Sequence, residues 1–461
     1  MWELILVAGL PALMQGGLTW LVLREKRKRV DEWEETVKSL GFRVTERSRS
    51  YGWFVKLEGQ QGAMRVRIED SRRKGHDART RVILSVPGPP GSAGLRIRRE
   101  GTYKTGAREI EIGDKAFDET FSIEGPMRVA ALLLDAEVRG ILTDLNALCR
   151  RIGIIGHEMV VELNDVQIPD ILPMLMKIGE RFSREMDVPQ SLAHNARQDQ
   201  EPGVRLLNLR FLVREFPGET LTTEVLRQAC SDPSPRVRLL AARGLGDEGR
   251  DVLLKLADDM EIDECSAQAI SALGKAMPFE RARDLLPVAL RRRRLQTAQA
   301  CLRSLVQSGQ PVAVDMLASL LDREDGELAA DAALALGETG NPEAEAPLIH
   351  ALRTGRSDIR AAAAKALGRA GSAAAVLPLK EAEENLAWDS ELRRAARQSI
   401  AEIQSRLPGA SHGQLSLAGE EAGQLSIADA EAGQLSLTVD SAGQLSLPDG
   451  ETPQRPERTS D

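Results

Sequence analysis

Four carboxylates stand close together in the sequence and have the residue types of a metal or acid–base site: Asp114, Asp118, Glu119 and Glu124. A metal or general acid–base site of this kind would also need His, Asn or a Gly-rich loop at ligand spacing, and none accompanies them. We therefore predict that they form the polar face and the turn of a pair of strands. His157-Glu158 begins like an HExxH zinc motif, but Val161 stands where the second histidine is required. We predict no catalytic residue, no cofactor and no metal.

The cysteines do not suggest a bridged or metal-bound fold. They are Cys149, Cys230, Cys265 and Cys301. Their wide spacing, without a CxxC pair or clustered histidine, excludes a disulfide framework and a zinc finger and fits a reducing compartment. Three of them fall at similar points of three helical hairpins, where we expect buried thiols that behave as small apolar side chains.

Four consecutive arginines, Arg291, Arg292, Arg293 and Arg294, are the candidate partner-binding residues. Guanidinium groups suit both phosphates and carboxylates, so the run favours an anionic partner. The alternative is a solvated turn, because neither interleaved aromatics nor a basic stripe accompanies the run, as nucleic-acid binding would require. A third interpretation is that these arginines contact the acidic C-terminal segment of the same chain.

The elements that position these arginines recur along the chain with a period near 31 residues. Helix ends align on Leu212, Leu245, Leu273, Leu305, Leu336, Leu367 and Ile400. Each copy has the length of two helices of about ten to twelve residues joined by short turns. In the copy at 342–371, aliphatic and alanine residues follow helical spacing and form one apolar stripe. We predict an all-α solenoid over residues 203–407, in which each hairpin buries its stripe against the next.

This pattern resembles the HEAT repeats, in particular the short bacterial class named after phycobilisome lyases, which reads approximately PLIxALxDxDxxVRxxAAxALGxxG. The signature residues are Asp232, Val237 and Arg238 in one copy and Asp358, Ile359 and Arg360 in another. The third and fourth hairpins depart from it, at Arg291–Arg294 and at residues 324–327. The resemblance implies an extended surface that binds another macromolecule. A minority of such proteins are bilin lyases or iron-dependent hydroxylases; the latter carry His-Glu pairs, whereas Ala351 follows His350, the one histidine of the array.

The N-terminus predicts a membrane anchor. Residues 4–23 are uncharged and long enough for one transmembrane helix, so we assign residues 1–23 to an anchor. Pro11 and the polar or small residues at 15–17 weaken the segment, which leaves a helix in the membrane interface as the alternative. A basic juxtamembrane segment, 24–30, follows with Arg24, Lys26, Arg27, Lys28 and Arg29. Such a cluster stays on the cytoplasmic side and attracts anionic headgroups, which predicts a bacterial inner-membrane protein whose bulk is cytoplasmic.

Residues 31–187 read as an α+β domain. Alternation such as Arg65-Val66-Arg67-Ile68 and Glu109-Ile110-Glu111-Ile112 predicts half-buried strands of an antiparallel sheet with one face covered by helices. We expect helices over 31–40, 127–149 and 169–184, and a strand over 158–163. The stretch 112–126 with the helix after it resembles a module found in bacterial proteins of unassigned role, often beside a membrane segment. Residues 188–202 read as a linker.

Residues 408–461 form an acidic tail in which GQLS(L/I) recurs every ten residues, starting at Gly413, Gly423, Gly433 and Gly443. The tail holds nine acidic and two basic residues, and its few aliphatic residues cannot form a core, so we predict disorder. QLSL resembles the bacterial sliding-clamp peptide, but the apolar residue that should follow is absent. Repeat expansion, a multivalent linear motif and a strand that adds to a sheet edge remain open.

The chain as a whole has a net charge of −8, is 42% hydrophobic and has only 3% aromatic residues, which favours packed helices over a large β-sandwich. The predicted fold is an α+β N-terminal domain followed by an all-α HEAT-like solenoid, with one transmembrane helix and a disordered tail. The predicted function is a non-enzymatic, membrane-anchored scaffold whose repeats bind an unidentified protein. The alternatives are a bilin-lyase-like enzyme of the same repeat class and a nucleic-acid-binding repeat protein.

Overall fold

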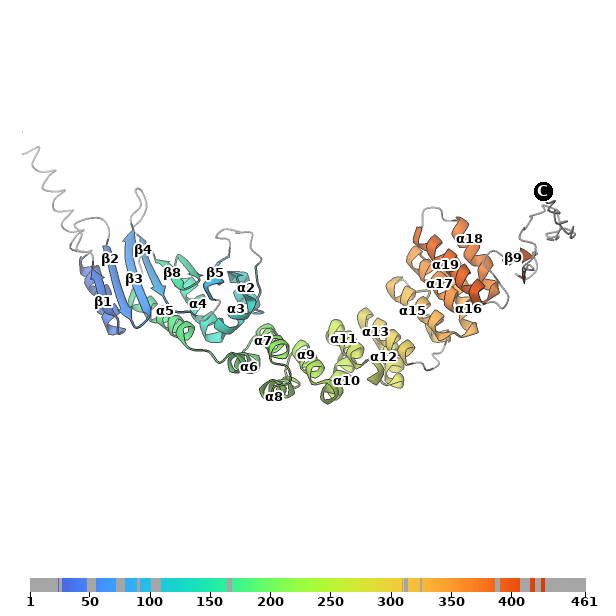
Figure 1. The fold of residues 1–461 in the computed structure, drawn as a ribbon, viewed down its shortest axis with the longest axis horizontal. Helices are drawn as coiled ribbons and strands as arrows, with labels where there is room; N and C mark the ends of the chain where they lie inside the picture. The colour runs from blue at the N-terminus through green and yellow to red at the C-terminus, as the bar shows by residue number, and fades with distance from the viewer. Residues whose placement is uncertain are drawn as a thin grey trace, which may run out of the picture. The chain divides into compact units, whose positions relative to one another are not determined.

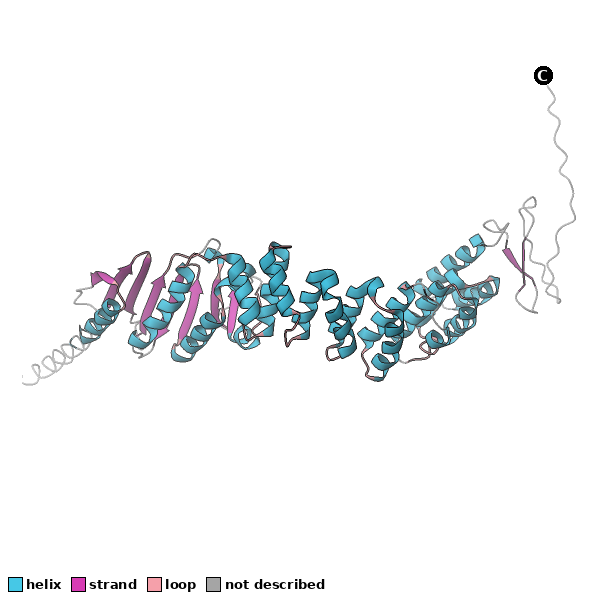
Figure 2. Cartoon of the chain, turned by 90° about the horizontal axis from the view of Figure 1, so that it is seen from below, coloured by secondary structure: helices cyan, strands magenta, loops and turns pink. Residues whose placement is uncertain are grey.

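The computed structural model (Figures 1 and 2) divides the chain into two compact units, Met1–Gly249 and Arg250–Asp461. The structure describes residues 24, 27–47, 55–71, 79–88, 92–100, 109–163, 168–308, 310, 314–323, 326–385, 390–406, 415–418 and 424–427. The predicted anchor, residues 1–23, lies outside these ranges. Within them, no helix combines the length and hydropathy that a membrane crossing requires.

The first unit contains an eight-stranded antiparallel sheet, as the alternating sequence pattern predicts. Its strands follow a helix at residues 27–39 and are β1 (Arg43–Arg47), β2 (Val55–Gln61), β3 (Met64–Ser71), β4 (Arg79–Ser85), β5 (Arg96–Arg99), β6 (Phe121–Glu124), β7 (Arg151–Ile155) and β8 (Glu158–Leu163). Their order in space is β1-β2-β3-β4-β8-β7-β5-β6. β7 has no counterpart in the sequence prediction. The expected strand around Ile110 is reduced to a single bridge between Glu109 and Glu124.

One face of the sheet is buried under helices and the other is charged. Leu57, Ile68 and Val82 lie on the buried face with no exposed surface. The α5 helix (Ile168–Ser183) contacts β4, and α4 (Ala136–Leu148) contacts β7. On the opposite face, Arg67 of β3 pairs with Glu58 of β2 at 2.8 Å. The two-residue alternation of a strand produces this division.

The predicted helix over 127–149 is two helices, α3 (Met127–Leu133) and α4, because Asp135 interrupts it. The Asp135 carboxylate accepts a hydrogen bond from the Val138 amide at 3.0 Å and so begins a new helix. Arg181 of α5 holds the other oxygen of Asp135 at 2.7 Å. Shorter helical segments are η1 (Ser92–Gly94) and α2 (Lys115–Thr120).

The stretch that we expected to be a linker, residues 188–202, contains a packed helix. α6 (Val188–Gln198) begins after the capping residue Asp187 and buries Leu192 and Ala193. The polar sequence misled the prediction because only one narrow stripe of this helix is apolar. α6 contacts α7 (Pro202–Glu215) and α8 (Thr220–Ala229). α9 (Pro235–Leu245) and η2 (Gly246–Gly249) complete the first unit.

The second unit is a helical repeat region. Its segments are α10 (Arg250–Asp259), α11 (Asp263–Leu273), η3 (Gly274–Ala276), α12 (Phe279–Arg291), α13 (Leu295–Gln307), α14 (Val314–Ala318), α15 (Gly326–Thr339), η4 (Pro342–Ala344), α16 (Glu345–Thr354), α17 (Ser357–Ala370), η5 (Ala373–Ala375), α18 (Val376–Asn385) and α19 (Ser390–Arg406). Each even-numbered helix contacts the odd-numbered helix that follows it. The odd-numbered helices α11 to α19 also contact one another in sequence, and we call them the odd row.

Small residues set the spacing within the odd row. A Cβ on Gly337 of α15 would lie 2.6 Å from the Cα of Ala366 in α17, so the two backbones meet at this glycine. Ala332, Ala333, Ala363 and Ala366 have no exposed surface. The alanines of the sequence pattern are therefore contact residues between neighbouring hairpins.

Part of the predicted disordered tail has regular structure. β9 (Leu415–Ala418) and β10 (Gln424–Ile427) pair as antiparallel strands, with Leu425 opposite Leu417. The ten-residue repeat places similar segments on either side of a short connection, and backbone pairing does not require a core. The other GQLS(L/I) copies lie outside the described residues.

Candidate functional site

The four clustered carboxylates have structural roles. Asp114 caps α2 by accepting a hydrogen bond from the Phe117 amide at 3.1 Å. Asp118 accepts hydrogen bonds from two backbone amides, and its burial raises its pKa. Glu124 of β6 lies 3.3 Å from Arg98 of β5, whereas Glu119 is exposed. The expected strand face therefore holds Glu124 alone of the four, because Asp118 and Glu119 lie in the helix α2.

A buried ion network that the sequence analysis missed begins at Asp114. The Arg139 Nε donates to Asp114 at 2.7 Å, and its Nη atoms donate to both oxygens of Asp199 at 3.0 and 2.9 Å. The side chains of Arg139 and Asp199 are 5% and 1% exposed. Although burial alone would lower the pKa of Arg139, the two carboxylates raise it, so the guanidinium stays charged. No sequence signal placed these residues together, because Arg139 and Asp199 are 60 positions apart in the chain.

The network continues into the first helical hairpins. Arg205 of α7 donates to the backbone oxygen of Asp199 and makes a bidentate pair with Asp232, at 2.7 and 2.8 Å. We call Asp114, Arg139, Asp199, Arg205 and Asp232 the junction network. Gly113 and Gly203 touch beside it, since a Cβ on either would lie under 2.5 Å from the other's backbone. The helices α6 to α9 are thus joined to the sheet domain by buried, charge-assisted hydrogen bonds.

The repeat-signature residues also have structural roles. Val237 and Ile359 are buried in the first turns of α9 and α17. Arg238 donates to the backbone oxygen of Asp232 and Arg360 to that of Leu352, each at 2.9 Å. The apolar and arginine positions are therefore equivalent in the two copies. The aspartates are not equivalent, because Asp232 precedes its helix and Asp358 lies within the first turn of α17.

The histidine and cysteine candidates form no reactive cluster. His157 Nδ1 accepts a hydrogen bond from the Gly88 amide at 3.1 Å. His350 is exposed on α16. Cys265 and Cys301 are buried as expected, while Cys230 is partly buried. Burial raises the pKa of the Cys301 thiol to about 12. In the ranges that the structure describes, no three His, Cys, Asp or Glu side chains stand close enough to hold a metal ion.

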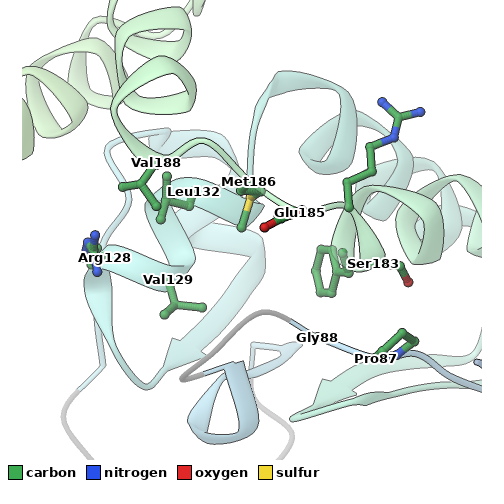
Figure 3. A pocket seen from close by; sticks show the side chains of 11 residues that line it. Pro87, Gly88, Arg128, Val129, Leu132, Ser183, Glu185, Met186 and Val188 are labelled. Carbon is green, nitrogen blue, oxygen red and sulfur yellow. The ribbon is translucent and has the colours of Figure 1, made fainter.

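A pocket of about 480 Å³ opens in the first unit between α3, the end of α5 and the loop that follows β4 (Figure 3). Val129 and Leu132 of α3, Phe182 of α5, and Met186 and Val188 beyond it form an apolar lining. The polar lining consists of Arg128, Ser183, Arg184 and Glu185. Arg128 pairs with Glu215 at 2.7 Å, and Ser183 donates to the Gly179 carbonyl, so both are already engaged. The lining of this pocket therefore suits the binding of an apolar side chain better than the catalysis of a reaction.

The four arginines occupy the turn between α12 and α13, and we call Arg291–Arg294 the arginine turn. Arg291, Arg292 and Arg293 are exposed, and no described carboxylate or carbonyl binds their side chains. Arg294 is half-buried and donates to the Glu261 carbonyl at 3.3 Å, while its buried Nε has no partner. Elsewhere in the second unit arginines pair with carboxylates, for example Arg303 and Arg369.

The exposed side of the odd row carries a series of ion pairs between neighbouring helices. Arg303 of α13 lies 3.3 Å from Asp331 of α15, Glu338 of α15 lies 2.9 Å from Arg369 of α17, and Lys365 of α17 lies 2.8 Å from Glu391 of α19. We call these six residues the paired face. Exposed pairs contribute only about 0–1 kcal/mol each, so a partner can replace them at little cost in stability.

Comparison with known proteins identifies the repeat type of part of the second unit. Residues 315–401, which cover most of α14 to α19, match the family model described as HEAT repeats. The HEAT-like interpretation is therefore confirmed for this region. Among solved structures, human deoxyhypusine hydroxylase in complex with glycerol is similar, with 19% identity over 47% of this chain and 85% of that chain and a TM-score of 0.21. A TM-score this low carries no argument about activity. No curated protein matches the chain.

Proposed function

We propose that the chain is a non-enzymatic scaffold, anchored in the bacterial inner membrane by residues 4–23, whose HEAT-repeat region binds a protein partner. The paired face carries this proposal. It lies on α13 to α19, and five of its six residues fall within the stretch that matches the HEAT model, the exception being Arg303. HEAT-like repeats present extended surfaces to other macromolecules.

Three features support a binding role over catalysis. The clustered carboxylates are engaged in caps and ion pairs, and burial raises the pKa of Cys149, Cys230 and Cys301. The pocket between α3 and the end of α5 has one carboxylate, Glu185, and no nucleophile paired with a base. A partner whose charged side chains take the place of the exposed ion pairs meets both positive and negative charges, which are spread over four helices. This charge pattern favours one orientation of the bound partner.

The partner-binding test compares two charge reversals of equal size in the full chain. Lys365→Glu with Arg369→Glu changes the paired face, whereas Arg353→Glu with Lys380→Glu changes exposed residues on the even-numbered helices α16 and α18. Each protein is used as bait in a detergent extract, and captured proteins are quantified. We expect at least one partner to be depleted about tenfold by the first pair alone, which corresponds to about 1.4 kcal/mol. Equal capture of every protein by the wild-type chain and both variants would contradict the assignment of partner binding to the paired face.

The anchoring test is independent of the partner. Full-length protein should remain in the membrane pellet after carbonate extraction, and deletion of residues 1–23 should release it. A chain that stays in the pellet after this deletion would show attachment by another route, and a full-length chain that carbonate extracts would contradict a spanning helix.

A further inference from the structure

The arginine turn concentrates positive charge for which the described part of the second unit supplies no counterion. Arg291, Arg292 and Arg293 are exposed and bind no described residue through their side chains. Close like charges repel one another, and the cost falls only when an anion binds or salt screens them. In the same unit, arginines such as Arg281 and Arg353 lie beside Asp258 and Glu381. An anionic group from elsewhere would relieve this repulsion.

The backbone of the turn holds the arginines in a strained geometry. Arg293 has a φ of 55°, in the left-handed region that favours glycine or asparagine. Met260, in the preceding turn, has a φ of 53°, so this turn shape recurs in the repeat. Glycine would satisfy the turn with less strain, yet the sequence places an arginine there and two more before it. In addition, the buried Nε of Arg294 has no partner.

The surroundings favour an acidic peptide over a nucleic acid. Acidic residues lie next to the turn: Arg294 donates to the Glu261 carbonyl, and the Asp263 carboxylate accepts hydrogen bonds from the Gln296 and Thr297 amides. They would repel a continuous phosphate backbone, whereas a peptide with spaced carboxylates can place single acids on single arginines. Of the aromatic residues in α12 and α13, Phe279 alone is present, at the far end of α12 from the turn.

The same unit ends in a segment of this chemistry. Residues 408–461 hold nine acidic and two basic residues, spaced by Gly, Ser and Ala. Three helix-to-helix steps of roughly 10 Å separate α13 from α19 within the odd row, or about 30 Å in all. Thirty residues of chain reach up to about 100 Å when extended. The acidic segment can therefore reach the turn from the end of α19, and tethering gives it a high effective concentration.

We propose that the arginine turn is a binding site for acidic, extended peptide and that its occupant in the free protein is the part of the chain's own segment 408–461 that follows the β9–β10 pair. This goes beyond the proposed scaffold function and does not depend on the paired face having a partner. A membrane-bound or soluble partner with a similar acidic segment would compete for the turn.

The test uses fluorescence energy transfer in the full chain. Gln307→Cys at the end of α13 and Thr438→Cys in the tail carry the dyes, in a background where Cys230 is replaced by Ser. The remaining thiols, Cys149, Cys265 and Cys301, are buried and stay unlabelled under native conditions. We expect high transfer efficiency at 50 mM salt and a loss at 1 M salt, where the Debye length falls to about 3 Å.

Two variants of equal charge change decide the outcome. Arg291→Glu with Arg292→Glu and Arg293→Glu should give at 50 mM salt the low efficiency that wild type shows at 1 M salt. Lys275→Glu with Lys380→Glu and Arg394→Glu reverses exposed, unpaired bases elsewhere in the unit and should leave the efficiency high. Equal efficiencies in all three proteins would overturn the proposal. A further control mixes molecules that carry only the donor dye with molecules that carry only the acceptor dye. Energy transfer in this mixture would show that the tail of a second copy occupies the turn, and it would overturn the proposal that the tail binds within its own chain.

Competition separates the peptide from other anions. An added synthetic peptide of residues 408–461 should lower the efficiency, whereas a version with every acid replaced by its amide should not. A DNA duplex that displaces the tail at lower concentration than the acidic peptide would overturn the peptide assignment. Because the paired face is unchanged in these proteins, a failed partner capture would leave this result intact.

Discussion

Removal of Arg139 should destabilise the first unit selectively and by a large amount. In Arg139→Met, Asp199 loses both bonds from the guanidinium and keeps the amide of Glu201 at 3.0 Å. Asp114 loses its bond at 2.7 Å, and the carbonyl of Leu134 loses its donor. Because Asp199 is 1% exposed, water cannot replace these bonds, and breaking a buried pair of this kind costs about 3–5 kcal/mol.

Hydrogen exchange followed by mass spectrometry measures this effect without assuming that the whole chain unfolds in one step. Peptides from α4, α6 and α7 should exchange roughly 100 to 4,000 times faster, at tenfold for each 1.4 kcal/mol. Peptides from α15 and α17 should be unchanged. Arg303→Met is the matched control, since this arginine is 64% exposed and its pair with Asp331 is worth at most about 1 kcal/mol. Less than tenfold acceleration in α6 would refute the assigned role of the junction network.

Three further predictions follow from local packing and ionisation. Gly140→Ala should stabilise α4 by about 0.5–1 kcal/mol, because the new methyl group meets no atom within 4 Å. Gly337→Ala should destabilise α15 by about 1–3 kcal/mol, because its methyl group meets the α17 backbone. The midpoints of urea unfolding should therefore shift in opposite directions, and shifts in the same direction would contradict this contrast. Cys301, with a pKa of about 12, should resist alkylation at pH 8 in the native chain and react after denaturation, and native labelling at the rate of a free thiol would be inconsistent with its burial. The bonded Lys38, together with Arg47, lowers the pKa of Glu34, so its contribution to stability is present above its unfolded pKa and is lost as pH falls through the lower folded value. The protection of helix 27–39 against hydrogen exchange, corrected for the pH dependence of the intrinsic exchange rate, should therefore fall on acidification, and this fall should be smaller in Glu34→Gln.

The sequence predicted what depends on local periodicity. Alternation around Arg65–Ile68 gave β3, and the 31-residue period gave the helical hairpins, because each pattern reports which side of one element is buried. The same reasoning failed at residues 127–149, where the capping side chain of Asp135 divides an otherwise continuous apolar pattern. It also failed at 188–202, where a largely polar sequence conceals a helix that buries one narrow stripe.

The candidate site was only partly predictable from the sequence. The arginine turn was visible because its four residues are consecutive, and the structure adds that three of them have no carboxylate partner among the residues it describes. The junction network was not visible, since Arg139 and Asp199 are separated by 60 positions and only the fold brings them together. The paired face depends in the same way on the packing of successive hairpins, which places Lys365 beside Glu391.

The junction network also has a mechanical consequence. Because Arg139 and Arg205 meet at Asp199, a pull on α7 or α9 is transmitted to α4 and the sheet through short polar bonds that have little room to stretch. Tension on these helices would therefore be carried by the whole first unit, and the first element to yield under load should lie outside this junction.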